Sequence, residues 1–271
     1  MNKRFDRLVR RVSATLRVLP DFLVVGAQKA GTSSLFYYLD QHPRIHGSSV
    51  KEIHYFDDGL DPDIHTYALG QAWYRAHFPL RHCLSQGDLS FEASPLYLFN
   101  PLAPERIAAD LPNVKIIVLL RDPVSRAISH YQHEKRKGRE DLDLADAFMQ
   151  EDARLASSIA TRDYKSFEFI RHSYQSRGRY AEQLERYFGL FGRERILVLE
   201  SGVLFKDPAA CLQQIYRFIG VDEPPATLDL TPNNVAENKL LVPDAVRSSL
   251  RRYFEPCNEA LFELIGQRYD W

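Results

Sequence analysis

Residues 22–39 read FLVVGAQKAGTSSLFYYL and contain three local patterns in succession. Residues 22–25 are a short apolar run that is typical of a buried strand, and residues 26–31 form a turn bounded by glycines. An apolar, aromatic run that indicates a helix begins at Thr32. In such a strand–turn–helix unit, backbone N–H groups converge on an anion and the helix dipole favours its charge. We therefore predict that this turn binds a phosphate group.

The placement of the lysine distinguishes this turn from the Walker A motif. Walker A has its lysine directly after the second glycine. Here Gly31 is followed by Thr32, and the lysine, Lys29, lies inside the turn. The turn is therefore not expected to hold the β- and γ-phosphates of Mg-ATP as an ATPase does.

Length and composition describe an ordinary globular chain of 271 residues, 45% hydrophobic and 26% charged, with enough residues for one large core. The formal net charge of −1 gives no bulk electrostatic reason to expect nucleic acid as a partner. The 3 cysteines are widely spaced and odd in number, which favours a reducing compartment over disulfides or a metal site. The sequence shows neither an apolar run long enough to span a membrane nor a signal peptide. We expect a cytoplasmic protein.

Residues 1–20 differ from the rest of the chain by their positive charge. Their basic side chains outnumber a single acidic one, Asp6. Their apolar side chains recur at helical spacing, at Phe5, Leu8, Val12, Leu16 and Leu19. We predict a basic amphipathic helix and favour its packing on the domain with a solvated basic face. The alternative is peripheral contact with an anionic membrane at its inner face.

The remaining pattern alternates strands and helices. Lys115–Leu120 and residues 195–199 are apolar runs typical of parallel strands that are covered on both faces. Asp122-Pro123 and Asp207-Pro208 each supply an N-cap and a proline at the first helical position, and a last helix is expected from about Asp244. This alternation predicts a single α/β, P-loop-like domain with a mostly parallel central sheet flanked by helices on both faces.

Residues 116–131, IIVLLRDPVSRAISHY, contain a second candidate anion site. Arg121 ends the strand-like run, and a guanidinium beside a helix start can bind a phosphate bidentately. Ser125 and Ser129 are four residues apart and share one helix face. Taken alone, this pattern is more often a capped helix with a surface arginine.

Residues 51–57, KEIHYFD, contain groups that could take a proton from an attacking hydroxyl. Glu52 is the first candidate, because the adjacent Lys51 would keep its carboxylate ionised and able to act as a base. His54 is the rival base, since its ordinary pKa lies nearer neutrality. The plain alternative is a set of solvated charges at the end of a strand.

The turn, the RDP motif about 90 residues later and the KEIHYFD segment together resemble the sulfotransferases that use 3′-phosphoadenosine 5′-phosphosulfate (PAPS). QKAGTSSL and the Asp-Trp ending resemble the heparan-sulfate-type, glucosaminyl 3-O-sulfotransferase-like branch. The resemblance implies a sulfotransferase domain over residues 21–271, preceded by the basic helix of residues 1–20. Animal relatives are membrane-anchored Golgi enzymes, so a chain without a visible anchor is expected to be bacterial.

The resemblance implies how the donor would be bound. Arg121 and Ser129 would hold the 3′-phosphate of PAPS, and Lys29 would lie near its bridging oxygen. Within SRGRYAEQL, Gly178 and Tyr180 would border the nucleotide, and Lys239 lies in the stretch that corresponds to a nucleotide lid. The residues that would cradle the 5′-phosphosulfate are Gln28, Lys29, Ala30, Gly31, Thr32 and Ser33.

The resemblance also implies how the acceptor would be bound. Glu52 would be the catalytic base, with His54 beside it. The residues that would contact the acceptor are Lys51, Asp57, Glu92 and Tyr97. In GDLSFEASPLY, Ala93 stands where the family often has a lysine that meets the acceptor. An anionic glycosaminoglycan would lose that contact, so we expect an acceptor other than heparan sulfate itself.

The predicted reaction is in-line transfer of a sulfuryl group from PAPS to a hydroxyl or amine of a carbohydrate, glycolipid or other small acceptor. Adenosine 3′,5′-bisphosphate would be the product, and no metal is expected to be required. One alternative is a P-loop-like small-molecule kinase. Another is a catalytically silent nucleotide-binding protein at the membrane surface. The sequence indicates no particular oligomeric state.

Overall fold

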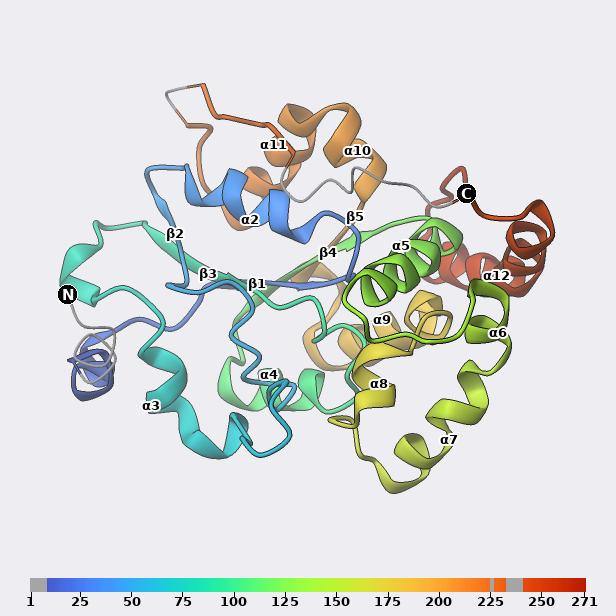
Figure 1. Cartoon of the computed structure of the whole chain (residues 1–271). Coiled ribbons are helices and arrows are strands. Elements are labelled where there is room, and N and C mark those ends of the chain that lie inside the picture. The colour runs from blue at the N-terminus through green and yellow to red at the C-terminus, as the bar shows by residue number, and fades with distance from the viewer. Residues whose placement is uncertain (1–8, 225–226, 233–240) are drawn as a thin grey trace.

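The structure is a computed structural model that describes residues 9–224, 227–232 and 241–271. At its centre is a sheet of parallel strands in the order β2-β3-β1-β4-β5 (Figure 1). The strands are β1 Phe22–Gly26, β2 Ile45–Gly47, β3 Leu89–Ala93, β4 Lys115–Leu120 and β5 Ile196–Glu200. The α-helices are α2 Thr32–Asp40, α3 Gly70–Arg75, α4 Ala103–Asp110, α5 Pro123–Arg136, α6 Leu144–Met149, α7 Glu151–Thr161, α8 Phe167–Arg171, α9 Tyr180–Phe191, α10 Ser201–Lys206, α11 Pro208–Ile219 and α12 Asp244–Ile265. Short 3-10 helices are η1 Ala14–Leu16, η2 Tyr67–Leu69, η3 Arg81–Cys83, η4 Ser176–Gly178 and η5 Arg193–Arg195.

The three predicted strands are present and form the middle and one edge of the sheet. β1 is buried along its whole length because it pairs with β3 on one side and β4 on the other. β5 begins and ends one residue later than predicted. β2 and β3 were not predicted, since β2 is only 3 residues long and β3 contains the polar Ser90 and Glu92. Both polar side chains are nevertheless fully buried.

The predicted helix starts are also confirmed. The Asp122 side chain accepts hydrogen bonds from the backbone N–H groups of Val124 and Ser125, and α5 begins at Pro123. Asp207 accepts in the same way from Ala210 at the start of α11. These caps satisfy N–H groups that a helix terminus leaves without a partner.

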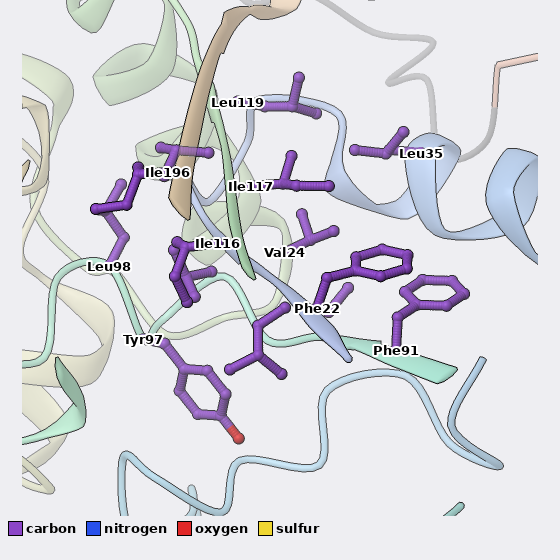
Figure 2. Close-up of a cluster of buried hydrophobic side chains, with 14 of the residues drawn as sticks. Phe22, Val24, Leu35, Phe91, Tyr97, Leu98, Ile116, Ile117, Leu119 and Ile196 are labelled. Carbon is purple, nitrogen blue, oxygen red and sulfur yellow. The ribbon is translucent and has the colours of Figure 1, made fainter. Parts of the chain in front are cut away.

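Helices cover both faces of the sheet, as predicted. In Figure 1, α2, α10 and α11 lie above the sheet, and α3 and α4 lie below it. The apolar side chains between these layers form one core around β1 and β4. Figure 2 shows part of it, where the ring of Phe22 stacks on that of Phe91 with centroids 5.0 Å apart. Tyr97 lies in the same cluster, below the strands.

The topology brings the predicted functional segments to one edge of the sheet. Residues 27–31 follow β1, Arg121 follows β4, and residues 51–57 come after β2. Because the strands are parallel, all three segments leave at the carboxyl ends. The chain also passes from one side of β1 to the other between β3 and β4, and such reversals are where open α/β sheets bind their ligands.

The predicted helix over residues 1–20 is shorter in the structure. Residues 1–8 lie outside the described part; residues 9–12 are helical, and η1 follows. Arg17 is extended and bridges Leu80, because its guanidinium donates to the Phe78 carbonyl at 2.6 Å. In this part the burial differs from the predicted solvated basic face: Arg17 is buried, whereas Val12 and Leu16 are 79% and 61% exposed.

Candidate active site

The donor loop, residues 26–33, joins β1 to α2. The first backbone hydrogen bond of α2 runs from Leu35 N to Gly31 O at 3.0 Å. The N–H groups of Thr32 and Ser33 therefore have no acceptor within the helix, and no side chain of the described residues caps it. Gly31 has φ 97°, and a Cβ there would lie 2.8 Å from the Phe205 ring. Backbone donors and a positive helix end thus face one point, which fits a phosphate group.

Arg121 reaches this loop. Its Nη1 donates to the carbonyl oxygen of Lys29 at 2.9 Å. The hydroxyl of Tyr180 in turn donates to the carbonyl oxygen of Arg121 at 2.9 Å. The two anion-binding segments predicted from the sequence are therefore adjacent in space.

The surroundings of Lys29 are strongly cationic. Burial lowers the pKa of the Lys29 ammonium, and the charges of Arg136 and Arg121 lower it further. Burial and the charge of Lys29 lower the pKa of His133, on α5, to about 4. Arg126 is fully buried nearby. A bound anion would offset this concentration of positive charge, so the site suits a ligand with several phosphate or sulfate oxygens.

Two predicted donor residues, Gly178 and Tyr180, are buried against other parts of the chain. Gly178 is buried, and a Cβ there would lie 2.6 Å from Phe254 and 2.9 Å from Pro123. Its missing side chain therefore allows close packing of η4 on α5 and α12. Tyr180 is buried, and its hydroxyl donates to the backbone carbonyl of Arg121. Ser129 is half-buried on α5. Lys239 lies outside the described residues.

The acceptor segment, residues 51–57, contains a linear set of charged contacts. Lys51 Nζ contacts Glu52 Oε1. The other Glu52 oxygen lies 3.5 Å from His54 Nε2, and His54 Nδ1 lies 2.6 Å from Asp57 Oδ2. The Glu52 side chain is 38% exposed, whereas that of Asp57 is fully buried. Glu52 is therefore the member of this set that an acceptor can reach.

These contacts determine the charges of the two candidate bases. Burial disfavours the charged imidazolium of His54, but the carboxylates of Asp57 and Glu52 outweigh it and raise the pKa of His54 to about 10. Burial likewise disfavours the ionised form of Glu52, but His54 and Lys51 outweigh it and lower the pKa of Glu52 to about 2. Near neutral pH, Glu52 is a carboxylate and His54 already carries both ring protons.

The backbone is unusual at the same residues. Among the described non-glycine residues, positive φ angles occur at Lys29, Glu52, His54, Asp58 and Arg162. A non-glycine residue in this region costs on the order of 1–3 kcal/mol and persists only where the surrounding structure holds it. Four of the five belong to or adjoin the donor loop and the acceptor segment. This clustering supports a functional reason for both conformations.

Glu92, Tyr97 and Asp57, which the resemblance assigns to the acceptor, all have buried side chains. The Tyr97 hydroxyl accepts a hydrogen bond from the backbone N–H of Tyr55 at 2.8 Å. Burial raises the pKa of Glu92 to about 7. Among these three side chains, Tyr97 thus holds the backbone of the acceptor segment at Tyr55.

Sequence reasoning missed two residues near the donor loop. Arg177 Nη1 donates to the Gln28 side-chain oxygen at 2.6 Å, although the two residues are 149 positions apart. His133 lies about three helical turns beyond Asp122 on α5, and the charge of Lys29 lowers its pKa. His133 shares a helix face with the predicted Ser129, four residues earlier, and this spacing was the available signal. No local pattern distinguished Arg177.

Comparisons with known proteins agree with this geometry. The chain is 26% identical to the membrane-associated sulfotransferase kil1 of Dictyostelium discoideum, over 96% of this chain and 68% of that protein. It is 31% identical to the bifunctional heparan sulfate N-deacetylase/N-sulfotransferase 2 of Bos taurus, over 75% of this chain but only 22% of that protein. A crystal structure of a sulfotransferase from Alicyclobacillus acidocaldarius superposes with a TM-score of 0.74 and 30% identity, covering 93% of this chain and 98% of that one. The family model described as the sulfotransferase domain matches residues 19–238, and the chain therefore belongs to the sulfotransferase family.

Proposed function

We propose that this sulfotransferase transfers the sulfuryl group of PAPS in one in-line step to a hydroxyl or amine of a carbohydrate, glycolipid or other small acceptor. The observation that carries the proposal is the contact between Arg121 and the Lys29 carbonyl, which places two anion-binding segments side by side. A nucleotide with phosphate groups at both its 3′ and 5′ positions requires such a pair. The kinase alternative is not favoured, because the chain belongs to the sulfotransferase family and its loop lacks the Walker A lysine.

The donor loop would bind the 5′ end through the backbone N–H groups of residues 31–33 and the Thr32 and Ser33 hydroxyls, since the Ala30 N–H already donates to the Ala27 carbonyl at 3.1 Å. Arg121, together with Ser129 on α5, would bind the 3′-phosphate. PAPS supplies the activated sulfuryl group, and adenosine 3′,5′-bisphosphate is the leaving group. Lys29 would offset the negative charge that develops on the bridging oxygen as the bond to sulfur breaks.

Glu52 would accept the proton of the attacking hydroxyl or amine. Its carboxylate is ionised at neutral pH and is the exposed member of the acceptor segment. His54 cannot take that proton while it is an imidazolium, so we assign it the role of orienting Glu52. Asp57 would hold His54 in place through the 2.6 Å contact. The sulfuryl acceptor would therefore approach between Lys29 and Glu52.

The acceptor class rests on the relatives. One is named as a heparan sulfate N-sulfotransferase, which supports a carbohydrate or glycolipid. Ala93, at the position where the family often has a lysine, is fully buried on β3 and offers no cation. Lys51 is the cation of the acceptor segment, and its side chain is 14% exposed. We therefore propose a carbohydrate acceptor other than heparan sulfate.

The direct test is incubation of the protein with sulfur-35-labelled PAPS and a cell extract, followed by mass spectrometry of the products. We expect an acceptor that gains one SO₃ group. Calorimetry should show that adenosine 3′,5′-bisphosphate binds more tightly than ATP. Tight binding without label transfer to any fraction would instead support the silent nucleotide-binding alternative, and preferential binding of ATP would support the kinase.

We also propose that the N-terminal segment contacts an anionic membrane surface, at the cytoplasmic face. Val12 and Leu16 are exposed apolar side chains within a basic segment, and one relative is named as membrane-associated. Among the described residues, no helix is long and apolar enough to cross a membrane. Such a combination suits binding to the surface.

Co-sedimentation with vesicles tests this contact. We expect binding to vesicles that contain anionic lipid, weaker binding at high salt, and loss of binding in the double variant Val12→Ser/Leu16→Ser. Ile159→Ser is the matched control, since Ile159 is 50% exposed on α7. Equal binding of the double variant and the control would contradict the contact.

A further inference from the structure

Arg177 is a buried cation whose hydrogen-bond acceptors are all uncharged. The residue is 3% exposed in η4. Its Nε donates to Ser173 Oγ at 2.7 Å, and its Nη2 donates to the carbonyl of Ile170 at 2.8 Å. The guanidinium also lies over the Phe99 ring, 5.0 Å from the centroid. The fold therefore holds the Nε and Nη2 atoms of the guanidinium and covers one of its faces.

The remaining nitrogen of the guanidinium, Nη1, faces the donor loop. Nη1 donates to Gln28 Oε1 at 2.6 Å, and Gln28 directly precedes Lys29. Arg121 holds the Lys29 carbonyl, and Tyr180 holds the carbonyl of Arg121. Arg177 and Tyr180 are three residues apart. One short segment therefore fixes the loop at two consecutive residues, Gln28 directly and Lys29 through Arg121.

We propose that Arg177 is a positioning residue for sulfuryl transfer, which holds Gln28 and thereby orients Lys29 toward the transferring group. The proposal rests on the proposed function. Lys29 has φ 70°, a conformation that a lysine adopts only when its surroundings impose it. The contact to Gln28 and the contact to the Lys29 carbonyl lie on either side of that torsion. Loss of one contact lets the loop relax, and the ammonium then moves away from its working position.

The neutral hydrogen-bond acceptors of Arg177 give it a second effect. Burial and the charge of Arg126 lower the pKa of Arg177 to about 9, although the charges of Glu134 and Glu151 oppose this shift. A buried cation of this kind is stabilised when an anion binds nearby. Arg177 therefore acts on the donor loop in two ways. It holds the conformation of the loop, and it favours the binding of an anionic ligand there.

The test compares Gln28→Ala, Arg177→Gln and their double variant. Misplacement of a catalytic group by about 1 Å can cost roughly 10²-fold, so we expect kcat to fall by about 10- to 100-fold in each single variant. The KM for PAPS should change much less than kcat. The double variant should be no slower than the slower single variant, because both substitutions break one contact. Arg177→Lys should rescue little, since a single ammonium cannot reproduce the planar set of bonds.

Arg195 provides the matched control. It also donates hydrogen bonds to backbone carbonyls, those of Phe191 and Pro112, and its guanidinium lies over the Phe191 ring. None of these contacts involves the donor loop. Arg195→Gln should lower Tm without changing kcat. Hydrogen exchange of peptides that cover residues 26–33 should accelerate in Arg177→Gln and stay unchanged in Arg195→Gln.

The outcomes separate the two proposals. If the wild-type protein transfers sulfate and Gln28→Ala has wild-type kcat and exchange, the positioning role is wrong and the proposed function stands. If Arg177→Gln does not fold, Gln28→Ala alone decides, since it removes the contact and keeps the arginine. If the wild-type protein transfers no sulfate to any acceptor, the proposed function fails, while the exchange measurement still decides whether Arg177 orders the loop.

Discussion

The donor loop and the acceptor segment lie at the same edge of the sheet but are built in different ways. The donor loop presents backbone N–H groups and is held by cationic side chains, Arg121 and Arg177. The acceptor segment presents one carboxylate, Glu52, and its backbone is held by hydroxyl groups and by the guanidinium of Arg106, which donates to the Phe56 carbonyl at 3.0 Å. The Thr66 hydroxyl donates to the His54 carbonyl at 2.5 Å, and the Tyr97 hydroxyl accepts from Tyr55 N. The first region thus gathers positive charge around backbone donors, whereas the second orients a single carboxylate through its contacts with Lys51 and His54.

This difference matches the two tasks. A donor with several negative charges is bound by any arrangement that supplies enough positive potential and N–H groups. A proton acceptor must instead be placed within hydrogen-bond distance of one atom. Positive φ angles at Glu52 and His54 show that the fold gives up backbone stability to achieve this placement.

Glu52→Gln should have the largest effect. The amide cannot accept the proton, so kcat should fall by about 10²- to 10⁴-fold. The affinity for adenosine 3′,5′-bisphosphate, measured by calorimetry, should stay unchanged because Glu52 is not part of the donor loop. Glu105→Gln, at an exposed position in the first turn of α4, is the control. A fully active Glu52→Gln enzyme would return the role of base to His54.

Lys29→Ala should cost about 10²- to 10³-fold in kcat, the typical loss when one group that stabilises developing charge is removed. Binding of adenosine 3′,5′-bisphosphate should weaken far less, because the loop N–H groups and Arg121 remain. Lys206→Ala, an exposed lysine at the end of α10, is the control. An equal loss in kcat and in affinity would mean that Lys29 only holds the donor.

The pH dependence of kcat distinguishes the two bases. Neither Glu52, with a pKa of about 2, nor His54, with a pKa of about 10, changes charge near neutrality. With Glu52 as base, kcat should stay flat between about pH 5 and pH 8. A steady rise of kcat across that range would indicate that neutral His54 is the base.

Asp57→Asn tests the contact that raises the pKa of His54. Removal of the neighbouring carboxylate should lower that pKa by about one to three units, as followed by NMR titration of the imidazole. The stability that His54 contributes is present below its ordinary pKa of 6.5 and is lost as pH rises through about 10. The difference in unfolding free energy between wild type and variant should therefore be largest just below about pH 6.5 and shrink as the pH rises toward 10. A pH-independent difference would contradict the charge pairing.

The donor side could be predicted from the sequence because its signals are local. Glycine spacing, an apolar strand and a following helix identify the loop, and Arg121 is found by its place at the end of β4. The supports of the acceptor segment depend on tertiary contacts instead. Tyr97 and Tyr55 are 42 residues apart, so nothing in the sequence indicates that one holds the other. For the same reason Arg177 and the buried Arg17 were not recognised as parts of the fold.

The smallest effects come from a matched pair of tyrosines, one for each region. Tyr97→Phe leaves the N–H of Tyr55 without its partner, and Tyr180→Phe leaves the carbonyl of Arg121 without its donor. Both hydroxyls belong to buried side chains, so each variant should lose about 1–2 kcal/mol of unfolding free energy in chemical denaturation. The kinetic effects should differ: Tyr97→Phe should raise the KM for the acceptor, and Tyr180→Phe should raise the KM for PAPS, each by only a few-fold. If both variants changed the same KM, the donor loop and the acceptor segment would share one support, and the separation of the two regions would be wrong.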